Sequence, residues 1–487
     1  MGRPPKPKQN PVQAAVSSWL DFLPTDLIDL VTSTTTNDAN DIKQTLLSGA
    51  PKRWVVYEPM VLLPSGSFSN HPWPTLLSTA TSAQKDELWT AILRGISPPA
   101  PKPPLTHLAV NEGIPLHNNT FGTSNDDNNE LIANQQHQET ENLLRSPTNL
   151  HPLYGSFGPL TTSSPSSSTT TTHPSDPNFN ATLWVSAKQN GLIQTWTPLH
   201  TMFSRGNIKE KARLLSFHQN TATTTKTTAA AATNTALRGK YAIDLYAGIG
   251  YFVFSYAALG LRVLCWELNA WSVEGLRRGA EANGFSVRVV SPPSSSPSLV
   301  DRPSPSEGED SNGDRKELAE VGGGDEVDMA AILAGPEQII VFLEDNRRAL
   351  ERIRPFLGGQ DHHGGYAPGG TIEVVHVNCG FLPTSQPVWH DAWEMATVSH
   401  TSGGRLSSTT LPGSWLHLHE NVGVADIEKR KRELQVLFDS WAGEQRESAQ
   451  QGSKALVEHV ELVKTYAPGV WHCVFDVRIV DRANIGD

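Results

Sequence analysis

The stretch from residue 240 to 284 constrains the fold more than any other part of the sequence. It contains an apolar segment at 241–246, a glycine turn, an apolar segment at 251–259 and a second strand-like segment at 262–266. This succession predicts a strand, a buried helix and another strand, which is one repeat of a doubly wound α/β fold. Because such folds bind ligands beyond the carboxyl ends of their strands, we expect a ligand at the glycine turn.

Two acids and two glycines indicate the class of ligand. Asp244 lies in the first strand, Gly248 and Gly250 form the turn, and Glu267 follows the second strand. A dinucleotide site has Gly or Ala where this chain has Val253. An acid followed by x-x-x-G-x-G is usual in S-adenosylmethionine enzymes, where Asp244 can face a cationic amino group and Glu267 can accept from both ribose hydroxyls. The pattern favours S-adenosylmethionine; the alternative is the same fold with an inactive pocket.

Later segments predict the remaining strands of the same sheet. A strand begins at 287–290 and is interrupted by the segment 291–328, and the last two segments predict a terminal hairpin. We expect a seven-stranded, Rossmann-like sheet of the class I methyltransferase type, with an antiparallel edge strand. The segments concerned are 287–290, 338–350, 372–378, 414–421, 454–466 and 471–480.

Polar residues follow two of these strands. Asp345 can accept from the exocyclic amine of adenine, and Asn346 can donate to a ring nitrogen, although Asp and Asn are also common helix caps. Asn378 ends the next strand, and the loop after it borders the expected site. That loop does not match the Asn/Asp-Pro-Pro-aromatic pattern of enzymes that methylate exocyclic amines.

A cationic segment at 202–217 precedes the glycine turn. Its basic residues Arg205, Lys209, Lys211 and Arg213 gather near the start of a predicted helix. One interpretation is a solvated charged face. The other is a lid over an anionic ligand, in which Lys211 pairs with a carboxylate and Arg205 with a phosphate.

Composition suggests how the chain is divided. Segments rich in Asn, Ser, Thr and Pro, or in acids, cannot bury enough apolar surface to order themselves, so we expect them to be disordered. We predict a tail at 1–10, an α+β region for recognition or packing at 11–120, an insert at 121–178, and an S-adenosylmethionine-binding transferase domain at 179–487 with inserts at 218–235 and 291–328.

The formal net charge of −11 argues at first against a nucleic-acid partner. Its distribution changes that interpretation. The segment 301–328 holds ten acids and three bases, and the segment 122–177 holds six acids and one base. These segments carry −7 and −5, so the rest of the chain carries +1 and can present local basic patches to phosphates.

Cysteine usage and hydropathy indicate the compartment. Cys265, Cys379 and Cys473 are far apart in apolar contexts, which excludes a disulfide framework or a C-x-x-C metal site and fits a reducing environment. The first residues lack the apolar core of a signal peptide, and no apolar run has the length of a membrane span. We expect a cytoplasmic protein with no membrane partner and no metal.

Several segments together resemble one family of tRNA-modifying enzymes. The similarity covers most of residues 182–480 and is to the wybutosine-synthesising enzymes that transfer the 3-amino-3-carboxypropyl group of S-adenosylmethionine. Guanine-N1 methyltransferases of tRNA share the fold and are the nearest alternative; a non-catalytic tRNA-binding protein is another. The matching segments are MFSRGNIKEK, DLYAGIGYFVFSYA, CWELNAWSVEGLRRGAEANG, EDNR, HVNCGFLPTS, HLHENV and VKTYAPGVWH.

The resemblance implies a substrate and a set of contacts. The acceptor is the tricyclic 4-demethylwyosine base beside the anticodon of tRNA-Phe, and methylthioadenosine is released. Ser204 and Lys211 would hold the aminocarboxypropyl arm, Glu267 the ribose, and Asp345 with Asn346 the adenine. No general base emerges, and Ala270 stands where the family more usually has proline.

The same resemblance suggests residues that contact the RNA. Arg205 and Lys209 are candidates for phosphate contacts. Phe381 opens an aromatic-rich loop at 381–389 that could stack on a splayed base, with core packing as the alternative.

Overall fold

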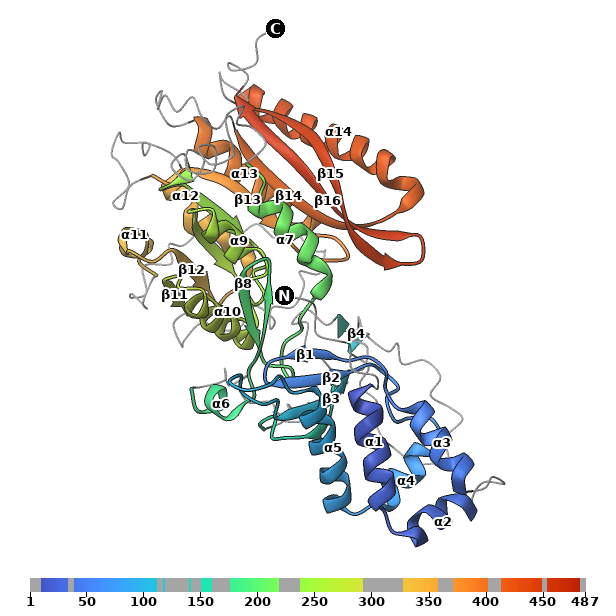
Figure 1. Ribbon diagram of the computed structural model, residues 1–487. Helices are drawn as coiled ribbons and strands as arrows, with labels where there is room; N and C mark the ends of the chain where they lie inside the picture. The colour runs from blue at the N-terminus through green and yellow to red at the C-terminus, as the bar shows by residue number, and fades with distance from the viewer. Residues whose placement is uncertain are drawn as a thin grey trace, which may run out of the picture. The chain divides into compact units, whose positions relative to one another are not determined.

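The structure is a computed structural model that describes residues 10–33, 39–111, 117–118, 140–141, 150–159, 176–218, 237–291, 327–357, 371–401, 413–448 and 453–481. The tail predicted at 1–10 and the inserts predicted at 121–178, 218–235 and 291–328 lie for the most part outside these residues. The chain divides into two compact units (Figure 1). The first comprises Met1–Arg205 and Ala270–Gly279, and the second comprises Gly206–Asn269 and Ala280–Asp487.

The first unit combines helices with a four-stranded sheet of order β1-β2-β3-β6. Strands β2 and β3 are parallel, while β1 and β6 pair antiparallel with their neighbours. The elements are α1 Pro11–Phe22, α2 Thr25–Ser33, α3 Ala39–Gly49, β1 Val55–Tyr57, β2 Met60–Leu63, α4 Trp73–Thr79, α5 Ser82–Ile96, β3 His107–Asn111, β4 His117–Asn118, β5 Thr140–Glu141, β6 Leu150–Tyr154, α6 Asp176–Ala181, β7 Val185–Gln189 and β8 Leu192–Trp196.

Two short turns in this unit follow from their residues. Pro59 separates β1 from β2, and Asn190 with Gly191 joins β7 to β8. The φ angles of Asn190 and Gly191 are 52° and 86°. This left-handed region is accessible to asparagine and glycine at little cost, which is why an Asn-Gly pair predicts a tight hairpin.

Tryptophans dominate the core of the first unit. The rings of Trp19 and Trp73 stack with centroids 6.3 Å apart, and Phe68 packs edge-on against Trp73 and Trp89. The indole N–H groups of Trp19 and Trp73 donate to backbone carbonyls of α5 and α3. Because their polar groups are satisfied, these large rings can be buried without an electrostatic penalty.

The second unit is built on an eight-stranded sheet of order β11-β12-β10-β9-β13-β14-β16-β15. Its elements are α7 Ile208–Leu215, β9 Tyr241–Asp244, α9 Val253–Ala258, β10 Arg262–Trp266, β11 Val287–Val290, α11 Met329–Ala334, β12 Ile339–Phe342, η4 Asn346–Arg348, α12 Ala349–Leu357, β13 Val374–Cys379, η5 Gln386–Val388, α13 Trp389–Thr401, β14 Ser414–Gly423, η6 Val424–Asp426, α14 Ile427–Ser448, β15 Ser453–Ala467 and β16 Val470–Asp481. The 3-10 helix η1 Arg205–Asn207 precedes α7, and α10 Ala270–Ala282 follows β10.

The sheet corrects two details of the prediction. Residues 287–290 do not continue into the segment at 338–350: they form their own strand β11, which pairs in parallel with β12 along the edge. This adds an eighth strand to the predicted seven. The antiparallel strand is β16, which lies between β14 and β15 and not at the edge. Short apolar runs in sequence cannot reveal whether they join one strand or make two.

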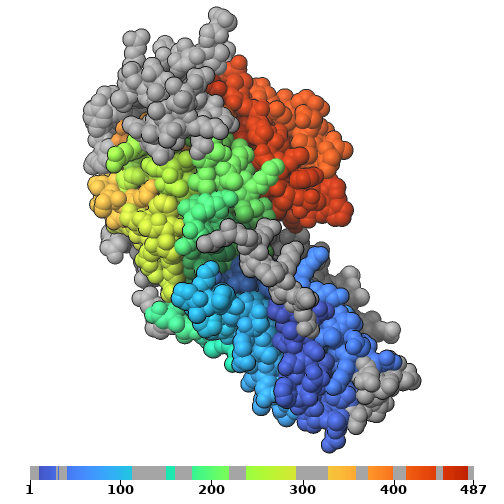
Figure 2. Space-filling model, viewed as in Figure 1, coloured from blue at the N-terminus to red at the C-terminus, as the bar shows by residue number. Residues whose placement is uncertain are grey.

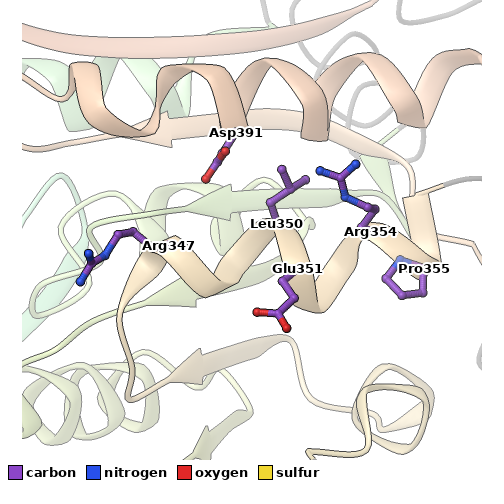
Figure 3. A pocket seen from close by; sticks show the side chains of 6 residues that line it. All are labelled: Arg347, Leu350, Glu351, Arg354, Pro355 and Asp391. Atoms are coloured by element: carbon purple, nitrogen blue, oxygen red, sulfur yellow. The ribbon is translucent and has the colours of Figure 1, made fainter. Parts of the chain in front are cut away.

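Helices cover the second sheet, and the C-terminal elements α14, β15 and β16 form the orange and red surface in Figure 2. Helix α12 contacts α13, and α13 packs on β13 and β14. A surface pocket of about 420 Å³ lies beside α12, with Asp391 pointing from α13 toward it (Figure 3). Its lining residues are Arg347, Leu350, Glu351, Arg354, Pro355 and Asp391.

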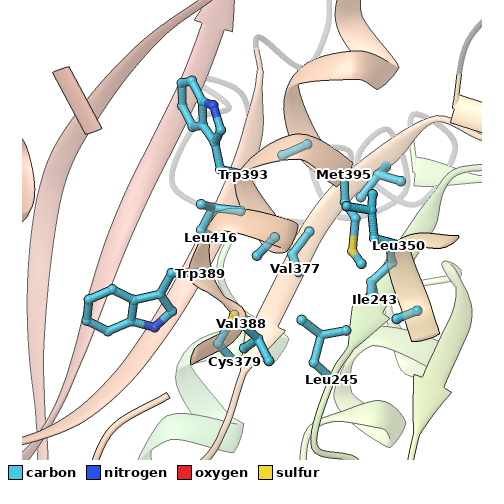
Figure 4. Packing of buried hydrophobic residues seen from close by; sticks show 14 of the residues in the cluster. Ile243, Leu245, Leu350, Val377, Cys379, Val388, Trp389, Trp393, Met395 and Leu416 are labelled. Atoms are coloured by element: carbon cyan, nitrogen blue, oxygen red, sulfur yellow. The ribbon is translucent and has the colours of Figure 1, made fainter. Parts of the chain in front are cut away.

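Apolar side chains from the central strands and α13 form the core of the second unit (Figure 4). Ile243 of β9 and Val377 of β13 are fully buried, as are Trp389 and Trp393 of α13. The indole of Trp389 donates to Ser385 Oγ at 2.8 Å. Trp389, at the end of the aromatic-rich loop, is therefore a core residue, as the alternative of core packing predicts.

An ionic cluster fixes α7 to the sheet. Arg213 of α7 donates to both oxygens of Asp476 of β16 at 2.5 and 3.0 Å, and to Glu210 at 2.6 and 2.8 Å. Burial by itself favours a raised pKa for Asp476, but a hydrogen bond from His417 and the charge of Arg213 outweigh it and lower that pKa. Asp476 is thus a buried carboxylate held charged by its partners.

Three histidines extend this cluster into the core. His417 Nδ1 lies 2.7 Å from Asp476 Oδ1, His417 Nε2 lies 3.0 Å from His376 Nδ1, and His376 Nε2 lies 2.8 Å from His218 Nε2. Burial lowers the pKa of His218 to about 4 and that of His376 well below its ordinary value. The chain of rings therefore satisfies buried polar atoms with neutral imidazoles at His218 and His376.

We expect an Asp476→Asn variant to lose roughly 1–3 kcal/mol of unfolding free energy, because Arg213 keeps only Glu210 as an anionic partner and His417 loses a charged acceptor. Urea denaturation of the full chain measures this loss. The matched control is Asp439→Asn on α14, where the carboxylate is exposed and a change within about 0.5 kcal/mol is expected. Equal stability of the two variants would contradict the role of this cluster.

Candidate active site

The carboxyl ends of parallel strands meet at one edge of the second sheet. Strand β9 lies between β10 and β13, and the chain leaves it first toward β10 and later returns on the side of β13. Doubly wound folds bind ligands at such a switch point. Asp244 ends β9 and lies in register with Cys265 of β10 and Asn378 of β13, while Glu267 follows β10. The two predicted acids therefore lie at the same edge.

Asp244 is fully buried, and only one of its two carboxylate oxygens accepts hydrogen bonds. Its Oδ1 accepts from the Tyr246 backbone N–H and from Asn378 Nδ2, each at 3.1 Å. Its Oδ2 is buried without a hydrogen-bond partner. Burial raises the pKa of Asp244 to about 7, and these two hydrogen bonds oppose the shift. An unsatisfied buried carboxylate oxygen is costly, and it fits a ligand that brings a cationic donor.

The glycine turn brings the backbone close to Glu267. Gly248 and Gly250 have φ angles of 54° and 88°, which favour glycine. A Cβ at Gly250 would lie 2.5 Å from the Phe254 ring. The Gly248 N–H donates to Glu267 Oε2 and the Asn269 N–H to Oε1, both at 2.8 Å. Burial raises the pKa of Glu267, and these amides oppose the rise, so the carboxylate is positioned by the turn itself.

Asp345 and Asn346 lie just after β12, where both also make local contacts. Asp345 accepts from the Arg347 N–H at 2.9 Å and forms an ion pair with its guanidinium at 2.6 Å. This confirms the helix-cap interpretation of Asp345. Asn346 Nδ2 donates to the Leu245 carbonyl at 2.7 Å and so connects the end of β12 to the end of β9. Their contact with adenine stays a prediction.

Phe381 stacks on Tyr246 at the same edge. The ring centroids are 5.0 Å apart and the ring planes differ by 26°. Both rings are half-buried. Burial raises the pKa of Tyr246 to about 12, while a hydrogen bond from Asn346 opposes the rise. The tyrosine therefore stays a neutral phenol beside the strand ends.

The cations of α7 do not form one solvated face. Lys211 is 2 % exposed, and its Nζ lies 5.2 Å from the ring centroid of Tyr251, the residue after the glycine turn. Arg213 belongs to the ionic cluster. Lys209 alone is largely exposed, and it pairs with Glu461 at 2.6 Å. The interpretation of a solvated face is therefore wrong for Lys211 and Arg213.

Two predicted residues belong to the first unit. Ser204 and Arg205 precede the boundary at Gly206, so they are described apart from the strand-end residues. Arg205 is close to Tyr57: burial raises the pKa of Tyr57, and the charge and hydrogen bond of Arg205 oppose that rise. The roles of Ser204 and Arg205 stay predictions.

Sequence reasoning did not assign site roles to three residues that the structure adds. Tyr246 and Tyr251 flank the glycine turn, and Asn378 donates to Asp244 across two strands. Tyr246 and Tyr251 stand inside the quoted glycine motif, so their position was a usable signal. Asn378 and Asp244 are 134 positions apart in the sequence, so no local pattern indicates that they contact each other.

Other candidate sites are not supported by the described part of the chain. The pocket beside α12 contains none of the predicted site residues and carries charges of both signs. Among the described residues, no group of three or more His, Cys, Asp or Glu side chains is arranged to hold a metal ion. No helix within those residues has the length and apolar character needed to cross a membrane.

The strand order, the switch point and a glycine turn between Asp244 and Glu267 are those of a class I S-adenosylmethionine-dependent transferase. No protein-family model matches the chain. The tRNA wybutosine-synthesizing protein 2 of Schizosaccharomyces pombe is 30% identical over 433 residues, which is 88% of this chain and 73% of that protein. Its Saccharomyces cerevisiae counterpart is 30% identical over 443 residues, covering 89% and 75% of the two chains. This chain therefore belongs to the tRNA wybutosine-synthesizing protein 2 family, which confirms the resemblance.

A solved structure shows a weaker likeness. The crystal structure of Pyrococcus horikoshii TYW2 in complex with MeSAdo has a TM-score of 0.44 and 13% sequence identity, with 93% of this chain and 99% of that chain covered. The family assignment rests on the two yeast relatives.

We expect a Gly250→Ala variant to bind S-adenosylmethionine at least about tenfold more weakly, because a Cβ would overlap Phe254 and strain the positive φ. Isothermal titration calorimetry measures the affinity. The control is Gly239→Ala, which has a φ of 83° but no atom within 4 Å of the added Cβ. Similar losses in both variants would show that strain alone, and not the packing of this turn, is responsible.

We expect a Lys211→Met variant to be more stable than the wild type at low pH. Burial, with a contribution from the charge of Lys464, lowers the pKa of Lys211 from 10.5 to about 7. Between these pH values the unfolded state binds more protons, so wild-type stability rises with pH, and the full penalty applies below about 7. The variant should gain at least about 1 kcal/mol near pH 6 in urea denaturation. A gain that does not shrink toward pH 10 would contradict this explanation.

Proposed function

We propose that this protein transfers the 3-amino-3-carboxypropyl group of S-adenosylmethionine to a ring carbon of the 4-demethylwyosine base beside the anticodon of tRNA-Phe. Family membership supports the class of reaction. The observation that carries the proposal is a buried acid and a buried lysine at the same glycine turn. Asp244 precedes the turn with a free buried oxygen, and Lys211 lies against Tyr251 after it.

These two charges match the two ends of the transferred arm. The arm carries one ammonium and one carboxylate, which Asp244 and Lys211 respectively complement. An enzyme that transferred the methyl group would bind the same arm, but here the arm must also be turned toward the acceptor. Rigid charge pairing at both ends restricts its rotation, which favours attack on the methylene carbon.

S-adenosylmethionine supplies a methylene carbon activated by the sulfonium: the base carbon attacks it, the C–S electron pair moves to sulfur, and the proton of the base carbon leaves to solvent. The residues of this chain contribute positioning. Glu267 would accept from the ribose hydroxyls, while Asp345 and Asn346 would contact adenine. Lys211 would hold the arm, and the role that the resemblance gives to Ser204 stays a prediction. Because no general base emerges, positioning and electrostatics would carry catalysis.

The acceptor side of the proposal rests on three residues. Phe381, stacked on Tyr246, offers an aromatic platform at the strand ends. Single-stranded RNA readers stack splayed bases on such rings. Arg205 and Lys209 would contact tRNA phosphates, and for Lys209 this requires exchange of its ion pair with Glu461.

The proposal is tested by identifying the small-molecule product. The purified protein is incubated with S-adenosylmethionine and with tRNA-Phe that carries the tricyclic base. The products are then separated and identified by mass spectrometry. We expect methylthioadenosine in a one-to-one ratio with modified tRNA. Release of S-adenosylhomocysteine would overturn the proposal and indicate a methyltransferase such as the guanine-N1 enzymes.

Two controls sharpen this assay. tRNA-Phe that lacks the tricyclic base should yield no methylthioadenosine. A Glu267→Ala variant should bind S-adenosylmethionine at least about tenfold more weakly, since it loses a charged acceptor for two hydroxyls. Wild-type affinity in this variant would exclude the ribose contact while leaving the product analysis valid.

A further inference from the structure

Lys464 of β15 lies against the segment that leads into α7. A Cβ built on Gly206 would overlap Lys464 Cδ and lie 3.2 Å from its Nζ. The absence of a side chain at Gly206 therefore lets the lysine stem pack on the backbone of the turn before α7. Lys464 is half-buried, and it pairs across the hairpin with His472.

The ammonium of Lys464 acts on several neighbours. Burial and then the charge of Lys464 lower the pKa of Lys211 to about 7 and that of His472 to about 3. Burial also lowers the pKa of Lys464 itself. The acid three residues before it, Glu461, pairs with Lys209. The region around Lys211 and Lys464 thus has a positive field that disfavours further protons and favours an anion.

This region borders the glycine turn. Lys211 Nζ lies 5.2 Å from the centroid of the Tyr251 ring. The Tyr251 ring carbons lie 3.0 Å from where a Cβ of Gly248 would be, so the same ring contacts the turn. A ligand held at the turn can therefore extend a charged group toward the lysines.

We propose that Lys464 and Lys211 together form the site for the carboxylate of the aminocarboxypropyl arm, with Lys464 as a residue that selects ligands carrying this arm. This inference rests on the proposed function. A carboxylate fits better than an RNA phosphate, because Lys211 is only 2 % exposed and a backbone phosphate would have to enter the fold to reach it. Two ammonium groups sharing one carboxylate relieve their mutual repulsion when the ligand binds.

The test compares a ligand that carries the arm with one that lacks both the arm and the positive charge on sulfur. Isothermal titration calorimetry on the full chain, without tRNA, measures the affinities of S-adenosylmethionine and of methylthioadenosine, which lacks the arm. For Lys464→Met we expect the first affinity to fall at least about tenfold and the second to stay within about twofold. Lys454→Met, on the same strand and similarly half-buried, should change neither.

Proton uptake gives a second readout that a merely structural role would not move. Titrations near pH 8 in buffers of different ionisation enthalpy should show that S-adenosylmethionine binding takes up protons, because the carboxylate raises the pKa of a lysine that is partly neutral there. Methylthioadenosine should take up none. In Lys464→Met the uptake should decrease, since Lys211 no longer faces a second ammonium.

Three results would overturn the inference. Equal losses for both ligands would make Lys464 a structural residue. Unchanged affinity for both ligands, with weaker tRNA binding, would make it a phosphate contact. Equal proton uptake in the wild type and in Lys464→Met would exclude a carboxylate shared by the two lysines. These binding measurements remain informative even if the product is S-adenosylhomocysteine. A failure of the proposed function can therefore be told apart from a failure of this inference.

Discussion

The parallel pairing of β9 with β10 on one side and β13 on the other is the constraint on which the site depends. It places Asp244 in register with Cys265 and Asn378, so that an acid, its amide partner and the glycine turn share one sheet edge. The turn then donates back to Glu267 through the Gly248 N–H. Backbone hydrogen bonds therefore position both acids, and little depends on side-chain flexibility.

A second interaction brings α7 to this edge. Arg213 shares its guanidinium between Glu210 on its own helix and Asp476 on β16. Because α7 also carries Lys211, the pair that holds the helix in place sets the position of a lysine beside Tyr251. A buried ion pair can contribute little net stability, yet removing one partner is costly because the other charge loses its compensation.

The site retains costly groups. Asp244 keeps a buried oxygen without a partner, and Lys211 is buried close to another cation. Both features oppose folding and both are relieved by a ligand with charges of opposite sign. At such positions a group that favours ligand binding lowers the stability of the unliganded fold. The free energy of binding offsets that loss of stability when the ligand is present.

The sequence by itself determined the local elements, because their signals are short-range. The glycine turn, the Asn-Gly hairpin, the strands that flank them and the acids at strand ends all follow from periodicity and turn chemistry. Only the tertiary structure decided that residues 287–290 form a separate edge strand, that Arg213 reaches Asp476 263 residues later, and that Lys464 packs on Gly206. Such partnerships depend on strand order and helix docking, and no local pattern encodes them.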